Sequence, residues 1–189
     1  RISAPSAASV VKSGNSGKTT TESFRADIDH LHEVYSFLLQ ECLTLSENHA
    51  NQLLFKRRLS DTTIAAKLYA TTPSSPAESR RVSQKMRGKF GDKLKGVPGF
   101  YKDNWMRRWI IKESICGGFF IPYRDETGRI NGLQVRRDDN SPEKYFWLST
   151  NPEYFSEGTS SGTPIHFTMP DLVKETGEIF LTEGALKAD

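Results

Sequence analysis

The chain has 189 residues, of which 36% are hydrophobic and 26% charged, and its formal net charge is +3. This length excludes two full domains, and eleven Phe, six Tyr and three Trp exclude a wholly disordered chain. The sequence has neither a run of the roughly 20 apolar residues that a membrane span needs nor a signal-peptide core, so we expect a cytoplasmic protein without a membrane partner. Two cysteines without a CxxC spacing and four scattered His predict neither a disulfide framework nor a zinc site.

Residues 1–27 are predicted to form a flexible arm, because the first 23 are rich in Ser, Thr, Gly and Ala without a periodic apolar signal. Within the arm, the stretch GNSGKTT imitates a phosphate-binding loop. Gly14 and Gly17 have two residues between them where the pattern needs four, and Lys12 occupies the position of the required glycine. We therefore interpret the stretch as a linker. The alternative is a nucleotide-binding loop, which would lose its nucleotide affinity in a Lys18→Ala variant.

Residues 28–117 are predicted to form a helical and basic connector. Ser46 fits the N-cap of a helix that runs to residue 57, and Ser60 with Asp61 opens the next helix. The helix before them begins at residue 28, where a three-four spacing places one apolar stripe on its surface: Ile28, Leu31, Tyr35, Leu38, Cys42 and Leu45.

The basic part of the connector covers residues 80–112, where eleven Lys and Arg face only Asp92 and Asp103. We expect a helix over residues 78–90, followed by a tight turn at Gly96-Val-Pro-Gly99. This charge distribution makes a polyanion the expected partner.

Aromatic residues are interleaved with the basic ones after this turn. Trp105 and Trp109 flank Arg107 and Arg108, a pattern that combines flat surfaces for bases with charge for phosphates. We predict that Arg107 and Arg108 bind nucleic acid. The alternative is that the aromatics belong to the core and the cations to a solvated face.

Residues 118–178 are predicted to form a β subdomain. The stretch FFIPYRDETGRINGLQVRR indicates two strands joined by a turn that ends at Gly128, and the alternation places Arg136 with Gln134 on a polar, open face. The stretch DDNSPEKYFWLST predicts a short strand with Lys144 at its entrance, and GTPIHF predicts another. Residues 179–182 predict a last apolar strand that ends at Glu183-Gly184.

Taken together, these stretches resemble the catalytic core of bacterial-type DNA primases, which are built around a toprim domain. The resemblance is carried by IPYRDETGRINGLQVRR, PEKYFWLST, GTPIHF and IFLTEGALKAD, in the family's order. Upstream, HANQLLFKRRLSDTTIAAKL resembles the helical lead-in, in which a Leu-x-x-Arg-Gly-Leu-Ser stretch opens a helix. The ending TEGALKAD resembles most the divergent primase-like proteins of plasmids, phages and other mobile elements. The family's zinc-binding module has no counterpart in these 189 residues; a place before residue 1 is the alternative.

The resemblance implies roles for particular residues. Arg136 matches the arginine that closes the hairpin motif and Lys144 the lysine of the Lys-Tyr motif, and both would hold template or nucleotide phosphates. Arg124, Arg129 and Arg137 in the same stretches are assigned to phosphate binding with them. Glu183 matches the toprim glutamate, which is catalytic and helps to position Mg²⁺.

This sequence also departs from the family pattern. Gln134 and Val135 replace two glycines, and Lys187 stands where replicative primases place Asp, with Asp189 two residues later. The resemblance implies that residues 179–189 begin a truncated toprim fold. The later Asp-x-Asp that would complete a two-metal site does not follow.

The predicted fold class is therefore α+β, with a helical N-terminal lead-in and a small mixed β-sheet that ends in the first toprim strand. The resemblance implies the N-terminal part of a primase core, inactive alone, with single-stranded DNA, NTPs and a replicative helicase as candidate partners and Mg²⁺ as cofactor once downstream acids are present. One alternative is a non-catalytic replication accessory module with a degenerate toprim domain. A toprim nuclease or topoisomerase is a third reading, and its nucleophilic tyrosine or nuclease domain is not visible.

Overall fold

The computed structural model describes residues 24–115, 117–139 and 141–189, so the GNSGKTT stretch lies outside the described residues. Its helices include two π-helical turns, η1 and η2, and two 3-10 turns, η3 and η4. In chain order the elements are α1 (Ile28–Phe37), η1 (Leu38–Cys42), α2 (Glu47–Asn51), η2 (Gln52–Lys56), α3 (Asp61–Lys67), β1 (Ala70–Thr71), α4 (Pro76–Phe90), η3 (Gly91–Leu94), β2 (Phe100–Lys102), β3 (Trp109–Ile111), η4 (Glu113–Ile115), β4 (Gly118–Arg124), β5 (Ile130–Arg137), β6 (Tyr145–Trp147), α5 (Pro170–Thr176) and α6 (Ala185–Ala188). No helix in these ranges is long and apolar enough to cross a membrane.

A four-stranded antiparallel sheet in the order β1-β4-β5-β6 is the centre of the molecule. Its long pair, β4 and β5, is joined by the predicted turn, in which Gly128 takes a φ of +83°. The Asp125 carboxylate stabilises this turn by accepting hydrogen bonds from the backbone N–H groups of Thr127 and Arg129, both at 2.9 Å. A separate antiparallel hairpin is formed by β2 and β3.

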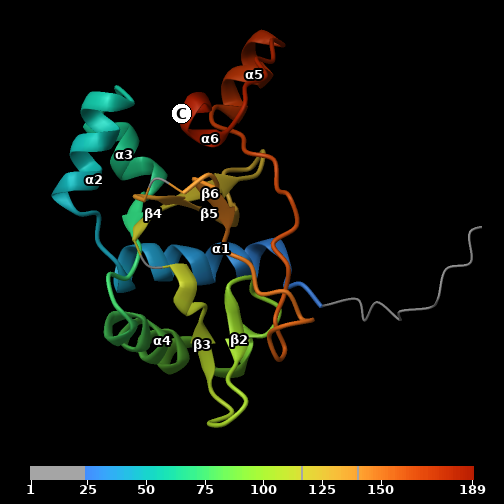
Figure 1. Ribbon diagram of the computed structural model, residues 1–189. Helices are drawn as coiled ribbons and strands as arrows, with labels where there is room; N and C mark the ends of the chain where they lie inside the picture. The colour runs from blue at the N-terminus through green and yellow to red at the C-terminus, as the bar shows by residue number, and fades with distance from the viewer. Residues whose placement is uncertain (1–23, 116, 140) are drawn as a thin grey trace, which may run out of the picture.

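Both faces of the sheet are covered, which explains why β4 is buried along almost its whole length. On the lower face, α1, α4 and the β2–β3 hairpin surround Phe120, Leu133 and Val135 (Figure 1). On the upper face, η2, α3 and α6 contribute to a second cluster that contains Phe119 and Ile121. Alternate residues of β4 therefore pack in two separate hydrophobic clusters, one on each face of the sheet.

The helix predictions for the lead-in are confirmed. The Ser46 and Ser60 hydroxyls accept hydrogen bonds from the backbone N–H groups of His49 and Thr63, as N-caps do. The stripe on the first helix is buried at Leu31, Tyr35 and Leu38, although π-helical turns end α1 and α2. The helix expected over residues 78–90 is α4, which Ser75 caps.

The α+β class is confirmed, but the sheet is antiparallel throughout and not mixed as expected. The expected last strand is the reason for the difference, because residues 179–182 form no strand and pair with no described strand. Ile179, Phe180 and Leu181 are 69%, 88% and 94% exposed, so they lack both the ladder and the packing that define a strand.

The strand expected in GTPIHF is also absent. Two hydrogen bonds to Arg124 join this segment to the sheet: the Phe167 N–H donates to the Arg124 carbonyl at 2.9 Å, and the Arg124 N–H donates to His166 Nδ1 at 3.0 Å. Strands β1, β2 and β3, none longer than three residues, were not predicted, and neither was α5.

Candidate nucleic-acid interface

Strand β5 presents Arg136 to the upper face of the sheet, as its alternation predicted. The face is not open, however, because η2 covers it and the guanidinium carbon lies 5.6 Å from the centre of the Phe119 ring. The Arg136 Nη1 group donates a 2.6 Å hydrogen bond to Gln52 Oε1. Its Nε is buried and has no hydrogen-bond partner in the described part of the chain. A guanidinium carries five N–H donors, so this one is only partly satisfied.

Arg57, which follows η2, lies beside the same strand edge and was not singled out from the sequence. Its Nη2 group donates to the Tyr145 hydroxyl at 3.3 Å, and Tyr145 pairs with Arg136 in the β5–β6 register. The next residue, Arg58, has a φ of +61°, a conformation that glycine adopts most readily. The Arg-Gly-Leu-Ser pattern of the resemblance would have identified both residues, because Arg58 occupies its glycine position.

Lys144 directly precedes β6 and is exposed. Its carbonyl accepts a 2.8 Å hydrogen bond from the Arg137 N–H, which fixes the lysine at the entrance of the strand, as predicted. The Lys144 side chain is thereby placed at the edge of the sheet, one residue before Tyr145.

The nearby carboxylates do not neutralise these cations. Asp138 lies 3.0 Å from Nε2 of the buried His49, and Asp139 accepts a 2.7 Å hydrogen bond from the Ser141 hydroxyl. No described carboxylate lies within 4 Å of the charged groups of Arg57, Arg136 or Lys144. We call Arg57, Arg136 and Lys144 the sheet-edge cluster because all three adjoin the edge formed by β5 and β6. No described contact joins the Lys144 ammonium group to either arginine, and the charge of the three is available to an anion.

Glu183 precedes α6, which packs on the upper face through Ala185 and Leu186. It is therefore on the same side of the sheet as Arg136, without an ion pair between the two. The Glu183 carboxylate is 93% exposed and lies 3.3 Å from Lys187 Nζ. It does not cap α6, because the N-cap is Gly184, whose φ is +79°.

Tyr123 occupies the space between β5 and α6. Its hydroxyl donates to Gln134 Oε1 at 3.3 Å, and the backbone N–H of Ala185 faces it. Burial raises the pKa of Tyr123, whereas the Ala185 N–H acts in the opposite direction. This contact positions the start of α6 over β4, the neighbour of the strand that carries Arg136.

The Asp189 carboxylate is buried and bonded to protein donors. Its side chain is 1% exposed and is bound by Lys67 and Thr168 at 2.7 Å and by His166 Nε2 at 2.8 Å. The Tyr69 hydroxyl donates a fourth hydrogen bond. Burial alone would raise the pKa of Asp189, but hydrogen bonds from His166, Lys67 and Tyr69 hold it well below the usual range.

The predicted magnesium site is not complete in the described residues. In residues 24–115, 117–139 and 141–189, no three His, Cys, Asp or Glu side chains converge on a position where a metal ion could bind. Mg²⁺ prefers near-octahedral oxygen ligation, and Glu183 supplies one exposed carboxylate that is already paired with Lys187. The residues present therefore do not fit Mg²⁺ by themselves.

Two of the arginines predicted to bind phosphate, Arg124 and Arg129, make hydrogen bonds to protein groups around the β4–β5 hairpin. Arg124 donates to the Gly128 carbonyl at 2.8 Å and to the carbonyls of Ala66 and Lys67, and burial lowers its pKa. Arg129 bonds Asp29 at 2.8 Å and Asp125 at 3.0 Å. Both arginines therefore have protein acceptors, and the Arg129–Asp29 pair lies at the surface.

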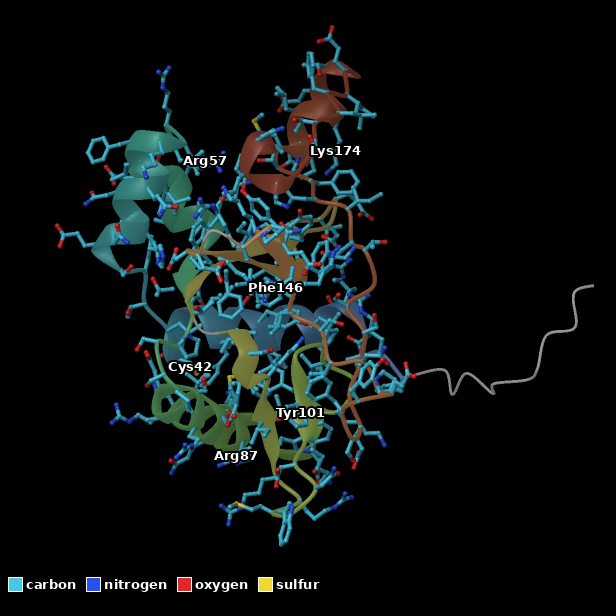
Figure 2. The ribbon with its side chains drawn as sticks, viewed as in Figure 1. Cys42, Arg57, Arg87, Tyr101, Phe146 and Lys174 are labelled. Atoms are coloured by element: carbon cyan, nitrogen blue, oxygen red, sulfur yellow. The ribbon has the colours of Figure 1, made fainter. Side chains whose placement is uncertain are left out.

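Three further predicted residues lie away from the sheet-edge cluster. Arg137 is on the lower face, 4.7 Å from the centre of the Phe146 ring. Arg107 and Arg108 belong to the tip of the β2–β3 hairpin, where Arg107 lies 3.6 Å from Glu157. Figure 2 shows Arg57 above the sheet and Arg87, which lies beside this hairpin, below it. The predicted residues therefore belong to two separate surfaces.

The aromatics near the hairpin are divided in the same way. Phe100 and Trp109 are 1% and 3% exposed and belong to the lower core, whereas Trp105 is 94% exposed. The alternative that these aromatics belong to the core is therefore correct for Phe100 and Trp109 and wrong for Trp105.

Comparison with known proteins gives similarity only at the level of solved structures, since no family model and no curated protein matches the sequence. A DnaG primase catalytic domain bound to ssDNA is similar with a TM-score of 0.49 and 17% identity over 80% of this chain and 45% of that one. The E. coli primase catalytic core is similar with a TM-score of 0.46 and 17% identity, over 80% of this chain and 45% of that one. A Mycobacterium tuberculosis DnaG RNA polymerase domain in complex with a double-stranded DNA oligomer is similar with a TM-score of 0.46 and 17% identity. This similarity covers 67% of this chain and 40% of that one. The chain thus spans less than half the length of these structures.

Proposed function

We propose that this chain is the N-terminal part of a toprim DNA primase core, and that it binds single-stranded DNA template and nucleotide phosphates for RNA primer synthesis. The observation that carries the proposal is the uncompensated charge of the sheet-edge cluster, above all the partly satisfied guanidinium of Arg136. A phosphate at this edge would be bound by the exposed Arg57 and Lys144 and by the accessible part of the Arg136 guanidinium, whose Nε is buried.

The three cations differ in what they contribute. Arg136 is held by Gln52 and the Phe119 ring, so its planar fork is oriented before a ligand arrives. Lys144 is exposed and supplies a mobile point charge. Tyr145, 40% exposed and bonded to Arg57, adds an aromatic surface beside them. Such phosphate contacts position a strand without reading its sequence.

Catalysis requires more than these residues. Glu183 lies on the same side of the sheet as Arg136, in keeping with a role at the phosphoryl group, but two-metal nucleotidyl transfer needs several carboxylates. We therefore propose that the chain alone makes no primers, and that Mg²⁺ binds once downstream toprim acids accompany Glu183. Cytoplasmic location, an origin among mobile elements and a helicase partner are further parts of the same proposal.

The binding proposal is tested with a fluorescent oligo(dT) 12-mer and an Arg136→Ala/Lys144→Ala variant. We expect the affinity to fall by about tenfold or more, and the slope of log K against log salt to decrease by about 1.4 because two phosphate contacts are lost. A Lys89→Ala/Lys93→Ala variant removes the same charge from an exposed region below the sheet and controls for net charge. Unchanged affinity and slope in the Arg136 variant would refute the proposal.

A second candidate function, a non-catalytic replication accessory module, is favoured by the Lys187–Glu183 ion pair and the buried Asp189. Primer synthesis by a longer chain with the downstream region, on single-stranded template with Mg²⁺ and NTPs, separates the two. Primers that a Glu183→Gln variant no longer makes identify an enzyme. DNA binding without primers identifies the accessory module.

A further inference from the structure

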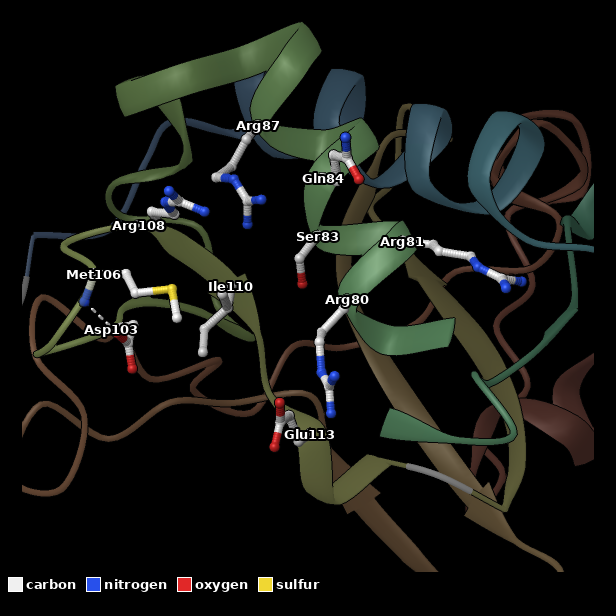
Figure 3. A pocket seen from close by; sticks show the side chains of 10 residues that line it. All are labelled: Arg80, Arg81, Ser83, Gln84, Arg87, Asp103, Met106, Arg108, Ile110 and Glu113. Atoms are coloured by element: carbon white, nitrogen blue, oxygen red, sulfur yellow. Dashed lines mark hydrogen bonds between the residues drawn. The ribbon is translucent and has the colours of Figure 1, made fainter. Parts of the chain in front are cut away.

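A cavity of about 450 Å³ lies between α4 and the β2–β3 hairpin, below the sheet (Figure 3). It shares no residue with the sheet-edge cluster. We call it the arginine pocket, because four of the residues that line it are Arg80, Arg81, Arg87 and Arg108.

The positive charge of the arginine pocket exceeds its negative charge. Only two carboxylates, Asp103 and Glu113, are among the lining residues. Asp103 serves the hairpin turn, since its Oδ1 accepts hydrogen bonds from the N–H groups of Trp105 at 3.1 Å and Met106 at 2.7 Å. Figure 3 shows the Arg81 guanidinium directed away from the pocket, so three guanidinium groups and two carboxylates remain around it, a net positive charge that attracts an anion.

Two of the guanidinium groups are directed toward each other. Arg87 is fixed by a 2.9 Å hydrogen bond from Nη1 to the Trp109 carbonyl, and Figure 3 shows Arg108 extending toward it from the hairpin. Burial and the charge of Arg108 both lower the pKa of Arg87, in keeping with two like charges held close together. An anion between them would relieve this repulsion and receive donors from both sides.

The tip of the hairpin carries an exposed aromatic side chain, Trp105, which precedes the lining residue Met106 in sequence and does not itself line the pocket. Trp105 is 94% exposed and Met106 is 68% exposed, although Asp103 orders the backbone of both. An indole that is exposed on an ordered turn retains a free face on which a planar group can stack.

We propose that the arginine pocket is a second binding site for single-stranded nucleic acid, in which a backbone phosphate lies between Arg87 and Arg108 and an unpaired base stacks on Trp105. Guanidinium groups and an aromatic face together match the phosphates and bases of a single strand. A duplex offers the phosphates without a free base face, and an acidic peptide offers the charge without a planar base. A free nucleotide offers both groups on a single unit.

The test measures binding of an oligo(dT) 12-mer to the full chain by anisotropy and by tryptophan fluorescence. Trp105→Ala and Arg108→Ala are at exposed positions, so they are expected to leave the fold intact, which circular dichroism checks. We expect each to weaken binding by about tenfold, and Trp105→Ala also to abolish the fluorescence quenching. Lys93→Ala removes one exposed charge from η3, outside the lining of the pocket, and should change the affinity less than twofold.

Three competitors identify the ligand class. We expect unlabelled oligo(dT) to displace the probe at lower concentration than a duplex of equal length, dTTP or polyglutamate does. Displacement by polyglutamate or by the duplex at equal concentration, or wild-type binding and quenching in both variants, would overturn the proposal. Displacement by dTTP at equal concentration would identify a free nucleotide as the ligand in place of a single strand, and would also overturn the proposal.

The outcome is separable from that of the sheet-edge cluster. Loss of binding in Arg108→Ala with wild-type binding in Arg136→Ala/Lys144→Ala supports the arginine pocket and refutes the proposed function. The reverse pattern refutes the arginine pocket alone.

Discussion

Two acidic residues near the end of the chain show how local surroundings decide what a carboxylate can do. Glu183 is almost fully exposed and has one partner, Lys187, whereas Asp189 is buried among four donors. The resemblance could identify Glu183 as the residue of interest. It could not show whether Asp189 is free, because its partners Lys67, Tyr69 and His166 are distant in sequence.

Replacing Asp189 tests whether this buried network fixes α6. Asp189→Asn should destabilise the protein by about 2–4 kcal/mol at pH 7, because Lys67 then remains buried without its counter-charge. Urea unfolding measures the difference in the free energy of unfolding. Hydrogen exchange should show faster opening of residues 185–188.

The same variant predicts a pH dependence. Because the folded protein holds the pKa of Asp189 below its ordinary value of about 3.9, the ionised carboxylate contributes its full stability above that value. The contribution is lost as the pH falls through the folded-state pKa. The stability difference between wild type and Asp189→Asn should therefore stay constant from pH 7 to about 4 and shrink below it. A difference that already disappears between pH 7 and 5 would contradict this role.

Some helices and strands could be predicted from the sequence and others could not. Helix starts were predictable from Ser46 and Ser60, and the β4–β5 hairpin from Gly128, since each depends on neighbouring residues. Strands β1, β2 and β3 depend on partners elsewhere in the chain, and residues 179–182 show the converse, an apolar run with no described partner. The hydrophobic pattern alone could not separate these cases.

Gly118 offers a test of the β4–β5 register that carries Arg136. A Cβ atom added to Gly118 would lie 2.1 Å from the Arg136 carbonyl oxygen, so Gly118→Ala should destabilise the protein by about 1–3 kcal/mol. Gly88, exposed in α4 with no atom within 4 Å of an added Cβ, is the control. Gly88→Ala should stabilise the protein by about 0.4–1 kcal/mol. Thermal unfolding of both variants measures the contrast, and equal effects would show that the register is misplaced.

The whole molecule is a sheet with a different kind of surface above and below it. The sheet-edge cluster and Glu183 are associated with the upper layer, and the arginine pocket with the lower one. The sequence analysis assigned one set of residues to nucleic-acid or nucleotide binding: Arg107, Arg108, Arg124, Arg129, Arg136, Arg137 and Lys144. The sequence could not separate these residues into two surfaces, because that depends on the face of the sheet on which each side chain lies. It also depends on whether protein carbonyls, such as that of Gly128, accept hydrogen bonds from the side chain.

Hydrogen–deuterium exchange with and without an oligo(dT) 12-mer would show directly whether a strand binds above the sheet. Binding at the sheet-edge cluster predicts slower exchange in residues 52–60 and 134–147, which contain Arg57, Arg136 and Lys144. These changes should weaken as salt is raised, because the contacts are to phosphates. Exchange that is unchanged in both ranges at saturating oligonucleotide would contradict the proposed function.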